Sequence, residues 1–204
     1  MNIALIVEGD GDHRAFPTLI AKTGAVVGEV HFANNPIKAG TAEKLAQEGK
    51  LEAALRLAAS RAGAELVLVA VDLDDGCPVA YHADFERRAK ALQTSGELGI
   101  PVRFCFCIRE YEAWFLASLE ALRLGAPEFD WIEAYTCDDP TAKRDAKGEI
   151  CRAMERHYKP SSHQLILTRA MDLKTLYASS RSYRKFVKSV LGVEYDLIEP
   201  YFLN

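Results

Sequence analysis

The chain has 204 residues and a formal net charge of −4, and its 49 % hydrophobic and 26 % charged residues are typical of a globular protein with one sizeable core. No apolar run approaches the roughly 20 residues needed to cross a bilayer, which argues against a membrane protein. Five cysteines without a CxxC pair argue against a secreted disulfide framework and a zinc finger, and they predict a reducing, cytoplasmic compartment.

Short apolar runs alternate with helical patterns along the first 110 residues. The run NIALIV precedes a helical pattern, and the weaker run AVVGEVHFA is interpreted as the second strand. Residues 40–63 read as one long Ala/Leu helix with Thr41 as its N-cap. The third run is ELVLVAV, and a helix over roughly Tyr81 to Gly96 leads to the fourth, PVRFCFCI. Strands that are apolar on both faces and alternate with helices predict a parallel sheet covered on both sides.

The character of the chain changes near Asp138. From there the pattern predicts three helices and no strand, with breaks at Pro160 and around Ser180. We therefore expect an α/β domain over 1–137 and a helical C-terminal appendage over 138–204 packed on it. The predicted fold class is α/β, with a mostly parallel four-stranded sheet flanked by helices.

Carboxylates follow each of the three clearest strands. Glu8 follows the first, Asp72 and Asp74 end the third, and Glu110 and Glu112 follow the fourth. The C-terminal ends of parallel strands share one edge of a sheet, so these side chains are expected to meet there. Without a cation they would repel one another, by about 4 kcal/mol per close pair at an effective dielectric near 20. Hard oxygen ligands suit Mg²⁺ or Mn²⁺, so the pattern predicts a metal site.

Other interpretations of the same acidic motifs fit less well. GDGDHR lacks the glycine and lysine spacing of a phosphate-binding loop, and DLDDGC has Gly76 where an EF-hand needs its fifth ligand. Asp10 or Asp12 is expected to cap the helix that follows. VAVDLDDG is similar to the nucleophile motif of haloacid-dehalogenase-type phosphatases, with Asp72 and Asp74 in its two roles. That interpretation leaves Glu8 without a function.

The motifs IVEGDGD and VDLDDG together resemble the Toprim catalytic domain of topoisomerases, DnaG-type primases and overcoming-lysogenization-defect nucleases. Glu8 matches the family's glutamate, and Asp72 and Asp74 match its Asp-x-Asp pair. The resemblance covers roughly residues 1 to 110 and implies a Toprim-like, Rossmann-like fold. No active-site tyrosine motif or primase zinc module accompanies it, which argues against a complete topoisomerase or primase.

The whole chain is more closely similar to a small Toprim-like family of unknown function, often encoded near ATPases and linked to defence against phage. The motifs that carry this likeness are IVEGDGDHRAF, DLDDGCP, REYEAWFLA, YKPSSHQLILTRAMDL and SYRKFVKSVLG. The resemblance implies an ATPase partner protein, and it leaves a homo-oligomer open.

The Toprim resemblance implies metal-assisted phosphodiester chemistry, and hence a Mg²⁺-dependent nuclease or hydrolase. Asp72 and Asp74 would hold the metal, and Glu8 would be a second ligand or the general base. Either Glu110 or Glu112 would complete a second metal position. Trp114, Phe115 and Leu119 are expected to be packing residues, and His13 is a proton carrier or a surface residue at a helix start. A non-catalytic Toprim-fold interaction subunit is the alternative function.

Basic residues are concentrated toward the C-terminus. Between 143 and 188 there are twelve Lys or Arg and four Asp or Glu, a local balance of +8, and the rest of the chain carries −12. This region is interpreted as a surface for the phosphates of DNA or RNA, or as a merely solvated helical face. The candidate nucleic-acid-binding residues are Arg169, Lys174, Arg181, Arg184, Lys185 and Lys188. Tyr158, Tyr177 and Tyr183 are expected in the core.

Overall fold

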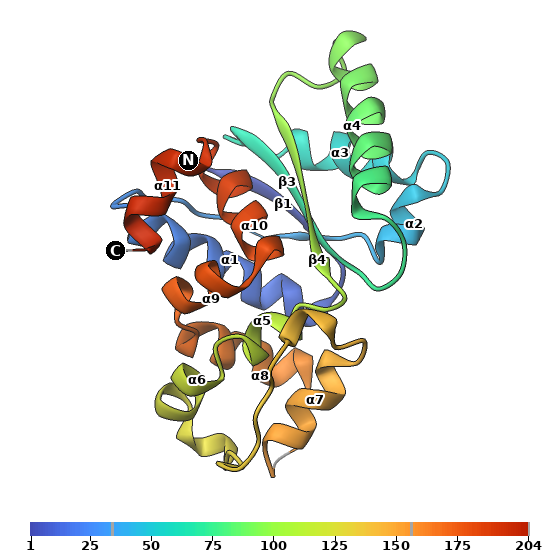
Figure 1. The fold of residues 1–204 in the computed structure, drawn as a ribbon. Coiled ribbons are helices and arrows are strands. Elements are labelled where there is room, and N and C mark those ends of the chain that lie inside the picture. Colours follow the sequence, from blue (N-terminus) through green and yellow to red (C-terminus); the bar gives the residue numbers. More distant parts are fainter. Residues whose placement is uncertain (34, 156, 204) are drawn as a thin grey trace.

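The computed structural model describes residues 1–33, 35–155 and 157–203, and four strands form an all-parallel sheet within it (Figure 1). The strands are β1 (Ile3–Val7), β2 (Ile37–Lys38), β3 (Leu66–Leu73) and β4 (Val102–Ile108), in the spatial order β2-β1-β3-β4. The predicted α/β fold class is confirmed, including the helical C-terminal region.

Helices lie on both faces of this sheet and continue beyond one end of it (Figure 1). They are α1 (Asp10–Val26), α2 (Ala42–Ala46), α3 (Lys50–Ala59), α4 (Pro78–Thr94), α5 (Glu112–Leu116), α6 (Leu119–Gly125), α7 (Ala146–Ala153), α8 (Pro160–Ala170), α9 (Leu173–Ser179), α10 (Arg181–Leu191) and α11 (Tyr195–Phe202). Two short 3-10 turns cover Pro127–Phe129 and Pro140–Ala142. None of the helices within the described ranges combines the length and the apolar character needed to cross a membrane.

The strands are buried on both faces, so alternate side chains enter two different cores. Leu5, Leu68 and Cys105 point into the core shared with α1, α5 and the C-terminal helices. Ile6 and Val69 point into the core formed with α2, α3 and α4. Continuous apolar runs are therefore typical of these strands, and the thiols of Cys105 and Cys107 in β4 are buried.

The strand predicted in AVVGEVHFA is wrong. Helix α1 ends at Val26, and the chain then turns at Gly28, whose φ of +74° few other residues adopt readily. Phe32 makes only an isolated parallel bridge with Asn2, and the second strand is the two-residue pair Ile37–Lys38. The β-branched residues at 26 and 27 have strand propensity, but the helix packs its buried face through Gly24, and that packing prevails.

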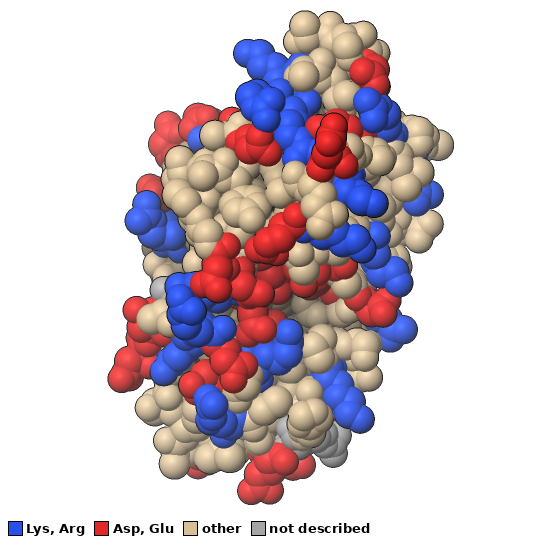
Figure 2. Space-filling view, turned by 90° about the vertical axis from the view of Figure 1, so that its right-hand side faces the viewer, with Lys and Arg blue, Asp and Glu red and all other residues tan. Residues whose placement is uncertain are grey.

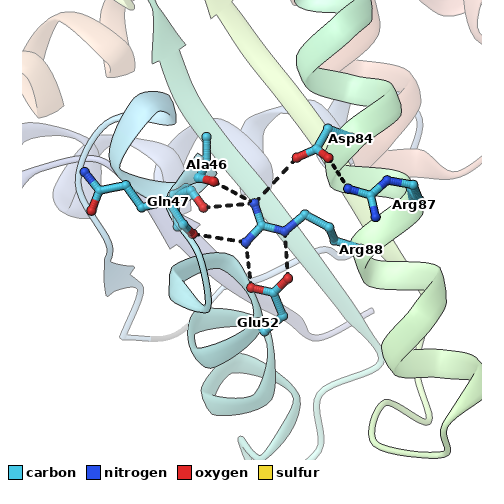
Figure 3. Close-up of polar contacts among 7 residues, drawn as sticks. Ala46, Gln47, Glu52, Asp84, Arg87 and Arg88 are labelled. Atoms are coloured by element: carbon cyan, nitrogen blue, oxygen red, sulfur yellow. Dashed lines mark hydrogen bonds and ion pairs between the residues drawn. The ribbon is translucent and has the colours of Figure 1, made fainter.

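The long helix predicted over 40–63 is divided in two. Gly49 adopts φ +72° between α2 and α3, and the predicted N-cap is confirmed, since the Thr41 hydroxyl accepts the backbone N–H of Lys44 at 3.3 Å. Buried Arg88 of α4 fixes the corner (Figure 3). Its guanidinium donates to both carboxylate oxygens of Glu52 at 2.6 and 2.7 Å, and to the carbonyls of Ala46 and Gln47 at 3.0 and 3.2 Å.

Residues 138–204 form five α-helices in the described part of the chain, where the sequence predicted three. Helix α8 lies along α1, and α10 lies against β4 and α1. A Cβ on Gly11 would overlap the side chain of Gln164, so this glycine permits the close approach of α1 and α8. The predicted core positions of Trp114, Tyr158 and Tyr183 are confirmed, and the Trp114 indole donates to the hydroxyl of Ser182 at 2.9 Å.

Candidate active site

The sheet has a topological switch between β1 and β3. The chain leaves β1 for β2 on one side, while β3 pairs with β1 on the other, and such a point opens a crevice at the C-terminal ends of the strands. Glu8 follows β1 directly, Asp72 lies near the end of β3 and Asp74 just beyond it. The backbone N–H of Asp72 lies close enough to the Glu8 carboxylate to lower the pKa of that carboxyl. The structure therefore brings the predicted triad together at this edge.

All three carboxylates of the triad have raised pKa values, and desolvation is the main cause in each case. Partial burial raises the pKa of Glu8 to about 7, and the charges of Asp12 and Asp74 add to the effect. The surrounding protein atoms raise the pKa of Asp72 well above its usual range, even though its side chain keeps some contact with solvent. Asp74 is exposed, and its pKa is raised by partial desolvation and by the nearby charge of Glu110. The ionised forms of these carboxylates are therefore disfavoured in the absence of a bound cation.

Asp12 is a member of this site that sequence reasoning assigned only to helix capping. That role is confirmed, because its carboxylate accepts the backbone N–H of Gly9 at 3.3 Å. It also accepts the side-chain N–H of Gln164 at 2.7 Å and is nearly buried, and burial raises its pKa. Asp10 points elsewhere and pairs with Lys38 at 2.7 Å. A capping motif and a site acid look the same in sequence, so the pattern alone could not separate these two aspartates.

The chain turns sharply after β4, at Arg109. Its φ of +70° lies in the left-handed region, which is costly for a residue with a side chain. The guanidinium contacts the backbone carbonyl of Asp74 and the carboxylate of Asp75, which ties this turn to the loop after β3. The turn directs the following residues, Glu110 and Glu112, toward the other carboxylates.

The two glutamates after β4 have different partners. The Glu110 carboxylate accepts the backbone N–H of Lys147 at 2.8 Å and its ammonium group at 3.2 Å. The Glu112 carboxylate is 2 % exposed and accepts the hydroxyl of Tyr158 at 2.9 Å. Burial raises the pKa of Glu112 to about 7. Glu110 therefore secures the start of α7, while Glu112 is an inward-facing acid at the junction of the sheet with the helical region.

We refer to the six carboxylates at this edge as the acidic rim. The acidic rim consists of Glu8, Asp12, Asp72, Asp74, Glu110 and Glu112. Acidic side chains gather across the middle of one face of the molecule, with basic side chains to either side (Figure 2). In addition to the rim, Asp75 pairs with Arg144 at 3.3 Å. The local field therefore changes sign within a short distance on this face.

Lys147 is a site residue that the sequence did not reveal. It lies in the second position of α7, where the Asp145 side chain caps the helix by accepting the backbone N–H of Gly148 at 2.8 Å. Its positive charge lowers the pKa of Glu8, Asp72 and every other rim acid for which a shift is resolved. The only sequence signal was membership of the basic C-terminal region, which says nothing about where this side chain points.

The acidic rim has the ligand chemistry of a Mg²⁺ or Mn²⁺ site. Its donors are hard oxygens, and a positive charge nearby would stabilise the ionised forms of carboxylates whose pKa values burial raises. Within the described residues, however, no three Asp, Glu, His or Cys side chains are grouped so that they could hold a metal ion as they stand. The donor set therefore fits a divalent cation in its chemistry, and binding requires the exposed carboxylates to draw together.

The predicted nucleic-acid-binding residues lie mainly on α9 and α10, and not on the acidic rim. Helix α10 runs beside β4 from Cys105 toward Arg103, away from the C-terminal ends of the strands. Arg184 donates to the carbonyls of Tyr177 and Ala178 at 2.8 and 3.0 Å. Lys188 pairs with Glu194, Lys185 is half-buried, and the other three are exposed. Their role toward nucleic acid stays a prediction.

A known family model matches most of the chain. Residues 7–191 match a family model described as a domain of unknown function (DUF4276). The chain belongs to this family. The matched region contains the whole acidic rim and Lys147, and it ends with α10. No curated protein and no solved structure matches the chain. The family's description names no activity, so the resemblance to Toprim enzymes stays a prediction.

Proposed function

We propose that this protein is a Mg²⁺- or Mn²⁺-dependent enzyme of the Toprim-like type that cleaves phosphodiester bonds in nucleic acid. The observation that carries the proposal is the convergence of Glu8, Asp72 and Asp74 at the topological switch of the sheet. Burial and the charges of neighbouring acids raise the pKa values of these carboxylates, and a bound divalent cation would stabilise their ionised forms. We further place the protein in the cytoplasm, on the basis of its cysteine usage.

The rim residues take distinct roles in this proposal. Asp72 and Asp74 would hold the cation, which would supply positive charge to polarise a phosphoryl oxygen and stabilise the charge that grows during cleavage. Glu8 is a further ligand or the base that accepts a proton from water. Glu112 faces the same junction but is deeply buried, so it acts on the rim through its charge and its hydrogen bond with Tyr158.

The test is cleavage of plasmid, single-stranded DNA and RNA by purified protein, with Mn²⁺ or with EDTA. We expect cleavage only with the metal. Asp74→Asn removes an exposed ligand at little risk to folding, and it should lower the rate by at least about a hundredfold if that carboxylate holds the metal. Asp10→Asn is the matched control, because Asp10 is an exposed acid of the β1–α1 junction that pairs with Lys38. Equal loss in both variants contradicts the assignment.

The substrate surface and the partners of the enzyme are part of the same proposal. The exposed residues Arg169, Lys174 and Arg181 are proposed to contact phosphates, so binding should weaken steeply with salt. An ATPase partner and a role in phage defence rest on the family resemblance alone. Neutralising these three residues should reduce nucleic-acid affinity without changing metal binding, which a filter-binding titration at two salt concentrations measures.

A second candidate function is a non-catalytic interaction subunit. The observation that favours it is that Lys147 already lies among the rim carboxylates. In the described residues, no three Asp, Glu, His or Cys side chains are grouped so that they could hold a metal ion. A lysine in such a place can serve as a permanent structural counter-ion. Under this alternative the purified protein is inert toward every nucleic acid with either metal, and Asp74→Asn keeps partner binding intact.

A further inference from the structure

The position of Lys147 is fixed by two independent features of the fold. Helix α7 has eight residues, and Asp145 caps it, so the backbone of Lys147 is held in the first turn. The Glu110 carboxylate then accepts both the backbone N–H and the ammonium group of Lys147. One acid that follows β4 therefore binds the same residue at two points, which is unlike the single contact of an exposed surface pair.

The ammonium group of Lys147 faces the rest of the acidic rim. Its charge acts on Glu8, Asp12, Asp72, Asp74 and Glu112, which come from two strand ends and two helices. The lysine side chain is nevertheless 43 % exposed, so a ligand entering the site from solvent can reach it. Lys147 is therefore a fixed positive charge that is accessible to solvent and close to carboxylates from several elements.

We propose that Lys147 is the second cation of this site, so that the acidic rim takes up one divalent ion and the ammonium group supplies the other positive charge toward a bound phosphate. The proposal rests on the proposed function, because it assigns a role within the same metal site. Two-metal sites hold their ions about 4 Å apart and use both to stabilise charge on the phosphate. Here the double attachment to Glu110 keeps one of those charges in the protein itself.

The test is Mn²⁺ binding by isothermal titration calorimetry, with electron paramagnetic resonance to count the bound ions. The wild-type chain should bind one Mn²⁺. Lys147→Met should bind a second ion or bind the first at least about tenfold more tightly, because a repelling charge has been removed. Lys147→Arg keeps the charge and should bind one ion as the wild type does. Lys90→Met, which changes an exposed lysine on α4, is the matched control and should leave binding unchanged.

Two results overturn the inference. Either the wild type binds two Mn²⁺ ions per chain with Lys147 present, or Lys147→Met and Lys147→Gln leave both stoichiometry and affinity unchanged while melting as the wild type does. The wild-type stoichiometry needs no variant, so the test stands even if both variants unfold. Absence of any Mn²⁺ binding overturns the inference and the proposed function together. If the wild type binds one Mn²⁺ ion and Lys147→Met changes the stoichiometry or the affinity, but no nucleic acid is cleaved, only the proposed function is overturned.

Discussion

The metal-free protein should lose stability as the pH rises from 5.5 to 8, and Glu112 should be a main contributor. Folding moves this carboxyl from its ordinary pKa of 4.5 to about 7. Between these two values the native state binds more protons than the unfolded chain, so the free energy of unfolding decreases with pH. The contribution of Glu112 is absent below about pH 4.5 and reaches its full size above about pH 7.

The magnitude follows from the size of the pKa shift. Each pKa unit corresponds to 1.36 kcal/mol, so a shift of roughly 2.5 units costs about 3 kcal/mol at high pH. About 2 kcal/mol of this cost should develop between pH 5.5 and 8. No large discount for solvent screening applies, because Glu112 is 2 % exposed. Burial and the neighbouring acids also raise the pKa of Glu8 and Asp72, which increases the wild-type slope in the same direction.

Urea unfolding in EDTA at pH 5.5 and pH 8 measures this effect. Glu112→Gln cannot ionise but keeps an oxygen that can accept the Tyr158 hydroxyl, so its stability should vary less with pH than that of the wild type. At pH 8 the variant should be the more stable of the two. Glu48→Gln changes an exposed glutamate and should follow the wild type at both pH values. Parallel stability curves for Glu112→Gln and the wild type would refute the reasoning.

Substitutions at three further positions test how the fold holds the site. Gly11→Ala should lower the free energy of unfolding, measured in urea, by about 1–3 kcal/mol, because the added Cβ would overlap the Gln164 side chain. Helix propensity alone favours alanine over glycine, so a variant as stable as the wild type contradicts that close packing. Arg88→Met should cost about 3 kcal/mol by leaving the Glu52 carboxylate without its bidentate partner, and an unchanged melting temperature argues against this. Arg109→Ala should be less stable than Arg109→Gly by about 1 kcal/mol, since only glycine relieves the positive φ, and the reverse order in urea contradicts the strain.

The sheet was largely predictable because its three long strands are buried on both faces. Such strands appear in sequence as unbroken apolar runs, and their alternation with helices defines a parallel sheet. The second strand could not be found in this way. It consists of Ile37–Lys38 alone, and it exists because β1 offers an unpaired edge beside it. Two residues carry no periodic signal, whereas the apolar residues near Val26 carried a misleading one.

The candidate site was predictable only where the backbone topology determines it. Glu8, Asp72 and Asp74 directly end or follow strands, so a parallel sheet is enough to bring them to one edge. Asp12 was ambiguous because capping explains it locally. Lys147 is 37 residues beyond Glu110 in sequence, and only the packing of α7 places it there. A residue delivered by tertiary packing leaves no local pattern to read.

The helical region after residue 137 supplies hydrogen-bond partners to the acids of the sheet. Lys147 of α7 binds Glu110, the Tyr158 hydroxyl binds Glu112, and a side chain from α8 binds Asp12 at 2.7 Å. Each of these three carboxylates is at least partly buried, and burying an ionised carboxylate without a hydrogen-bond partner is costly at neutral pH. The acidic rim therefore depends on both halves of the chain, and its hydrogen-bond partners come largely from the helical region.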